Sequence, residues 1–80
     1  MNITVLYYLD RIKNSKGYNF RINKMIKEIN TLISEYRITA LKTKGYTRQY
    51  CNREADYLEK RLEEALYNKK GNRNGKYSYT

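Results

Sequence analysis

Apolar side chains recur at spacings of three and four residues through the middle of the chain, the pattern of one stripe on an α-helix. From Phe20 onward the stripe consists of Ile22, Met25, Ile26, Ile29, Leu32, Ile33, Tyr36 and Ala40. Asn19 precedes it as a candidate N-cap, and Gly45 follows as a candidate residue just past its C-terminal end. The pattern predicts a helix of about 25 residues, roughly 37 Å long.

A second stripe follows with smaller side chains and a strict seven-residue repeat. Its members are Cys51, Ala55, Leu58, Leu62 and Ala65. Thr47 is the expected N-cap, and Gly71 lies just past the expected end. Only Gly45 and Tyr46 separate the two predicted helices, so we expect them to fold back as an antiparallel hairpin.

The opening segment, residues 2–13, fits two patterns. A helical stripe would be made by Val5, Tyr8, Leu9 and Ile12, whereas alternation along the segment would place Ile3, Val5, Tyr7 and Leu9 on one side of a strand. The strand would need residues 76–80 as its partner. A mainly α fold is therefore predicted, with an antiparallel two-helix hairpin as core and a short N-terminal helix packed on it. The alternative is a strand pairing with the C-terminal tail.

Eighty residues suffice for one small domain, which leaves little room for an enclosed active site. We expect the helical domain to comprise residues 1–70 and a basic, tyrosine-containing tail to comprise residues 71–80. The chain has no histidine and one cysteine, Cys51, which excludes a disulfide within the chain and the usual zinc and triad chemistry. We predict no catalytic residues, no metal, no cofactor and no small-molecule substrate.

The apolar runs are too short for a membrane span, so no membrane partner is expected. A single buried cysteine fits a reducing compartment. These features predict a cytoplasmic protein, in the host cytoplasm if the chain is encoded by a phage.

Charge is distributed unevenly along the chain, with 17 basic and 8 acidic residues and a formal net charge of +9. Residues 1–46 hold nine basic and three acidic side chains, residues 47–68 hold four and five, and residues 69–80 hold four and none. Ten tyrosines accompany one phenylalanine. Tyrosine offers an apolar face with a polar tip, and net positive charge attracts polyanions, so both features indicate a binding surface.

The leading hypothesis is a non-catalytic binding protein that contacts nucleic acid, or a nucleic-acid–protein complex, through its N-terminal basic turn and its C-terminal tail. Cations would meet phosphates and the tail tyrosines would stack. The expected contact residues are Lys13, Lys16, Arg21, Lys69, Lys70, Arg73, Lys76, Tyr77 and Tyr79. Lys24 and Lys27 lie opposite the core stripe, but the acidic Glu28 and Glu35 on the same helix favour an ordinary solvated surface there.

A second hypothesis is a protein inhibitor or adaptor. In its small size and its richness in Lys, Asn, Ile and Tyr, the chain resembles accessory proteins of bacteriophages and mobile elements, including anti-CRISPR and other counter-defence proteins. That resemblance implies docking on a nucleic-acid-handling enzyme. The expected interface anchors are Tyr50, Arg53, Tyr57, Arg61 and Ile38, since Tyr and Arg are common at the centres of interfaces. A homodimer is a further possibility, because an isolated two-helix seam leaves apolar surface to cover.

One short segment, residues 52–58, resembles the Ser-Gln-Glu-Leu-Asp motif of small sporulation-type aspartyl-phosphate phosphatases. Glu54 and Asp56 match the motif, whereas Asn52 and Arg53 replace its Ser and Gln. The resemblance implies a third function, hydrolysis of the aspartyl phosphate of a response regulator.

Overall fold

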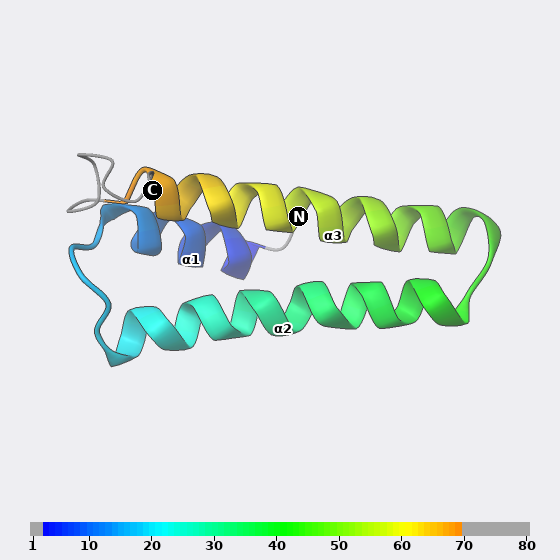
Figure 1. Ribbon diagram of the computed structural model, residues 1–80, viewed down its shortest axis with the longest axis horizontal. Helices are drawn as coiled ribbons and strands as arrows, with labels where there is room; N and C mark the ends of the chain where they lie inside the picture. The colour runs from blue at the N-terminus through cyan, green and yellow to red at the C-terminus, as the bar shows by residue number, and fades with distance from the viewer. Residues whose placement is uncertain (1–2, 70–80) are drawn as a thin grey trace.

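The computed structural model describes residues 3–69 and contains, within that range, the helices α1 (Ile3–Asn14), α2 (Phe20–Lys42) and α3 (Gly45–Tyr67). Figure 1 shows α2 and α3 running antiparallel, with α1 packed against them. The predicted mainly α fold is confirmed, and the strand alternative for the opening segment is wrong. Val5, Leu9 and Ile12 are buried along one stripe of α1, so the helical period determines the structure of this segment.

Helix α1 covers only part of the hairpin. Its 12 residues span about 18 Å, whereas the 23 residues of α2 and of α3 each span about 34 Å. Figure 1 shows α1 beside the half of the hairpin where α2 begins and α3 ends. The half near the α2–α3 connection therefore lacks a third helix from residues 3–69.

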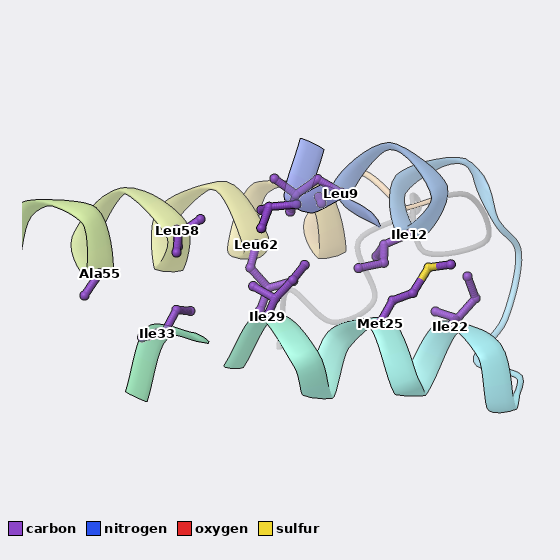
Figure 2. Packing of buried hydrophobic residues seen from close by; sticks show 11 residues of the cluster. Leu9, Ile12, Ile22, Met25, Ile29, Ile33, Ala55, Leu58 and Leu62 are labelled. Atoms are coloured by element: carbon purple, nitrogen blue, oxygen red, sulfur yellow. The ribbon is translucent and has the colours of Figure 1, made fainter. Parts of the chain in front are cut away.

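The core is a single cluster that draws on all three helices (Figure 2). Ile12, Ile29 and Leu58 are almost completely removed from solvent. Cys51 and Ala55 are buried along α3, as the seven-residue repeat predicts, and small side chains at these positions let α3 approach α2 closely. The core thus forms where α1 meets the hairpin and continues along the hairpin seam.

Local contacts define the start of α2 and the end of α1. The predicted cap is confirmed, because the Asn19 side-chain oxygen accepts a hydrogen bond from the backbone N–H of Ile22 at 2.9 Å. Helix α1 ends at Asn14, and Gly17 in the loop that follows adopts a φ of 72° that favours glycine. The Ser15 hydroxyl donates to the Arg11 carbonyl at 2.7 Å and so gives a hydrogen-bond partner to a carbonyl in the last turn of α1.

The α2–α3 connection consists of Thr43 and Lys44, so it is as short as predicted but lies two residues earlier, and Gly45 is not the residue just past the end of α2. Helix α3 begins at Gly45, whose φ is 63°, and Lys44 is its N-cap, so the prediction of Thr47 as N-cap is wrong. Arg48 gives a physical reason for the position of this connection. Its Nε donates to the carbonyls of Ala40 and Thr43, each at 3.0 Å, and so satisfies acceptors at the end of α2 that the helix itself leaves open.

None of the helices within residues 3–69 combines the length and the apolar character that crossing a membrane requires. The boundary predicted at residue 70 lies at the edge of the described range, so the separation into a domain and a tail stays a prediction.

Candidate functional site

The most strongly charged part of the described structure is the segment of residues 11–27, which we call the basic segment. It contains no carboxylate and six cationic side chains: Arg11, Lys13, Lys16, Arg21, Lys24 and Lys27. All six residues are exposed. Among residues 3–69, the ion pairs are made by Arg37 with Asp56 and Glu59, so none of the six charges is neutralised by an ion pair within that range. The end of the bundle where α1 leads into α2 is therefore positively charged.

The cations of the basic segment do not all lie on one face. Lys13 lines a groove of about 310 Å³ between α1 and α3, together with Arg61 and the acidic Asp10 and Glu64. The structure thus brings together Lys13 and Arg61, which the sequence assigned to two different surfaces. Two carboxylates balance these two cations, so this groove has little net attraction for a polyanion.

A second groove lies on the outer side of α2 and has a volume of about 560 Å³. Its lining residues are Phe20, Asn23, Lys24, Lys27, Glu28 and Thr31. Spacings of three residues place Lys24 beside both Arg21 and Lys27 on the helix surface. We call Phe20, Arg21, Lys24 and Lys27 the α2 basic face.

Glu28 is one of the two carboxylates, with Glu35, that counted against this face in the sequence. In the structure the Tyr8 hydroxyl donates a hydrogen bond to Glu28 Oε1 at 2.7 Å, which holds the carboxylate at the side of α2 that faces α1. That hydrogen bond, and then burial, raise the pKa of the Tyr8 hydroxyl. Glu28 is therefore engaged at the edge of the groove, and the three cations of the α2 basic face lie N-terminal to it.

Lys69 was expected to contact phosphate, but it is buried. Its ammonium donates a hydrogen bond to the Ser15 carbonyl and lies 4.9 Å from the centre of the Tyr18 ring. Burial lowers the pKa of the Lys69 ammonium. Lys69 therefore joins the end of α3 to the α1–α2 connection and supports the loop that carries Lys16, and it does not offer an exposed charge.

The half of the hairpin near the α2–α3 connection carries a group of aromatic rings, which we call the tyrosine face: Tyr36, Tyr46 and Tyr50. Tyr36 meets Tyr50 edge to face at 6.4 Å, and Tyr46 stacks on Tyr50 at 6.4 Å. Tyr46 is 76% exposed and Tyr50 is 45% exposed. Burial is the largest cause that raises the pKa of the Tyr36 hydroxyl. The rings thus form a preassembled, partly exposed apolar surface.

The predicted interface anchors are only partly brought together. Tyr57 lies two turns after Tyr50 on the same flank of α3, and the Arg61 guanidinium lies 5.7 Å from the Tyr57 ring centre. Arg53 lines a groove of about 570 Å³ with Tyr57. Ile38 is 50% exposed, but it lies two residues beyond Tyr36, so the helix turns it well away from the tyrosine face.

Several predictions lie outside the described residues or remain untested. Lys70, Arg73, Lys76, Tyr77 and Tyr79 lie beyond residue 69, as does the proposed strand partner at residues 76–80. Within residues 3–69 no three His, Cys, Asp or Glu side chains gather as metal ligands.

The phosphatase hypothesis also stays a prediction. Of its two matching carboxylates, Asp56 accepts a hydrogen bond from Arg37 at 2.9 Å, and Glu54 lines the groove that also holds Arg53.

Sequence reasoning gave too little weight to Phe20, Lys24 and Lys27. Phe20 is 83% exposed at the first position of α2, although it adjoins the apolar stripe in the sequence. The spacing of four and three residues among these side chains was a signal that could have marked them as one face.

Comparison with protein-family models, with curated protein sequences and with solved structures finds no match to this chain.

Proposed function

We propose that this protein is a non-catalytic nucleic-acid-binding protein whose basic segment contacts the phosphate backbone. The observation that supports this proposal is the run of six exposed cations without a carboxylate in residues 11–27. Phosphate contacts release counterions that are condensed on the nucleic acid, and this release drives binding without a particular base sequence. Contacts of this kind position a protein along a strand, whereas base contacts would be needed to specify a sequence.

The α2 basic face is the centre of the proposed contact. Arg21, Lys24 and Lys27 lie three residues apart, so they span about 9 Å along the helix axis. Phosphates of one strand recur about every 3.4 Å along a duplex axis, and flexible lysine side chains can reach several of them. Lys16 extends the contact from the α1–α2 connection, which Lys69 holds against the end of α3.

The test compares two variants that lose the same charge. The first carries Lys16→Gln, Arg21→Gln, Lys24→Gln and Lys27→Gln. The matched control carries Lys42→Gln, Lys44→Gln, Arg53→Gln and Lys60→Gln, four exposed cations outside the basic segment.

Fluorescence anisotropy with labelled oligonucleotides would measure both variants at the same salt concentration. We expect the first variant to lose about 1–4 kcal/mol of binding free energy, or roughly 5- to 1000-fold in affinity. We expect the control to lose clearly less. Equal losses would show that net charge alone attracts the ligand, and absence of binding by the natural chain would refute the proposal.

The tyrosine face supports a second candidate function, docking on a protein that handles nucleic acid, as in the phage-type inhibitor hypothesis. Preassembled Tyr rings suit a protein interface because they supply apolar area at low cost in conformational entropy. The variant Tyr46→Ser/Tyr50→Ser should abolish capture of a partner from nuclease-treated lysate, whereas Tyr7→Ser/Tyr67→Ser, which alters two exposed tyrosines elsewhere, should not. Sedimentation velocity on the purified chain would distinguish self-association, the homodimer hypothesis, from capture of a different protein.

A further inference from the structure

From the position of Phe20 beside these cations, we infer that the α2 basic face binds single-stranded nucleic acid in preference to a duplex, with Phe20 stacking on an unpaired base. This inference rests on the proposed function, because it requires that the basic segment binds nucleic acid at all. It goes further by assigning the form of the ligand and a residue that contacts a base.

Phe20 is an exposed aromatic residue at the start of α2. Phe20 is the only phenylalanine of the chain, and it is 83% exposed while apolar side chains one turn further along α2 are buried. Burying a phenylalanine side chain stabilises a fold by about 1.5–3 kcal/mol. Because Phe20 is exposed, it does not add this stabilisation to the described core. The Asn19 cap fixes the backbone where Phe20 begins α2, so the ring stands at a defined place on the surface.

Cationic side chains surround Phe20. Lys24 and Lys27 lie four and seven residues further along α2, on the same side of the helix as Phe20, and all three line one open groove. A strand that follows the helix axis could place phosphates on the two ammonium groups and a base on the ring. Asn23 and Thr31 add polar groups at the groove wall, and Glu28, held by Tyr8, is the carboxylate that the strand would have to pass.

The chemistry of stacking selects between the two forms of nucleic acid. A base inside a duplex has both faces covered by its neighbours, so an aromatic ring can reach it only after unstacking, which costs a few kcal/mol. An unpaired base has a free face, and stacking on an aromatic side chain needs no particular base identity. Basic residues and aromatic rings in one groove are the combination by which proteins bind single strands without sequence preference.

The experiment measures anisotropy of labelled single-stranded DNA and RNA of about 12 nucleotides, within the usual range of such sites, and of the corresponding duplexes. The variant Phe20→Leu keeps an apolar side chain but removes the aromatic ring. Tyr67→Leu, which alters an exposed tyrosine at the end of α3, is the matched control. Circular dichroism of both variants verifies that the helices are retained.

We expect the natural chain to bind single strands more tightly than duplexes at equal salt. Phe20→Leu should weaken single-strand binding by about 5- to 100-fold, as removal of one stacking contact does, and should leave duplex binding and the Tyr67→Leu control unchanged. Equal affinity for both forms, or an unchanged single-strand affinity in Phe20→Leu, would overturn this inference and leave the proposed function in place. Absence of binding to every oligonucleotide would instead overturn the proposed function.

Discussion

Replacing the buried Lys69 by methionine tests how the ends of the bundle are joined. Methionine has a similar length and no charge, so Lys69→Met removes the hydrogen bond to the Ser15 carbonyl and the contact with the Tyr18 ring. A hydrogen bond to a charged group contributes about 1.5–3 kcal/mol, and a cation–π contact contributes about 0.5–1 kcal/mol. The cost of burying the ammonium, which the variant no longer carries, opposes this loss.

We expect the lost hydrogen bond and ring contact to destabilise the fold by more than removal of the buried charge stabilises it. Because the Ser15 carbonyl would lose its partner, the free energy of unfolding should fall by about 1–2 kcal/mol at pH 7. For a domain of this size that change lowers Tm by about 4–16 °C. Thermal and urea unfolding followed by circular dichroism would measure it. Lys60→Met, at an exposed position of α3, should change stability by no more than about 0.5 kcal/mol.

The difference in the free energy of unfolding between the natural chain and Lys69→Met should depend on pH, with a sign that follows from the pKa of Lys69. Burial lowers the pKa of Lys69 in the folded state, so in the window between that lowered value and about 10.4 the unfolded chain binds more protons. The natural chain should therefore become more stable relative to Lys69→Met as pH rises through this window. A variant at least as stable as the natural chain, with a difference that does not change with pH, would refute this role of Lys69.

Two further predictions concern packing and surface charge. Ile29→Ala should lower the free energy of unfolding by about 2–5 kcal/mol, because Ile29 is 1% exposed in the core, whereas Ile38→Ala at a half-exposed position should change it little; urea denaturation measures both. Arg37→Gln removes the ion pairs with Asp56 and Glu59, each at 2.9 Å, but these side chains are exposed. We therefore expect a small decrease in Tm that vanishes at high salt, and a decrease as large as that of Ile29→Ala would contradict it.

The two hairpin helices were predictable because each carries a regular apolar stripe, whereas residues 2–13 fit the pattern of a helix and that of a strand. The spacing of Ile22, Ile29 and Ile33 on α2, and of Leu58 and Leu62 on α3, reflects which side of each helix is buried. Patterns of this kind depend on helix geometry alone, so they can be read without knowledge of the partner element.

Features that depend on contacts between distant residues could not be predicted. Lys69 is 54 residues from Ser15, and nothing near it in the sequence indicates that its ammonium is buried. Arg48 donates to two carbonyls at the C-terminal end of α2, and these contacts favour a start of α3 before Thr47. The capping preferences of the residues around Thr47 give no sign of these contacts. For the candidate site, Lys16 and Arg21 were predicted from charge, whereas the role of Tyr8 in holding Glu28 required the packing of α1.

The most direct test of the central claim is the dependence of nucleic-acid affinity on salt, measured for the natural chain and for the variant that carries glutamine at Lys16, Arg21, Lys24 and Lys27. The logarithm of the binding constant should fall linearly with the logarithm of salt concentration. Each phosphate contact with a single strand contributes about 0.7 to the slope, so the four substitutions should make it shallower by about 2–3. A natural chain whose affinity does not depend on salt, or a variant with an unchanged slope, would contradict the assignment of the basic segment as the phosphate-binding surface.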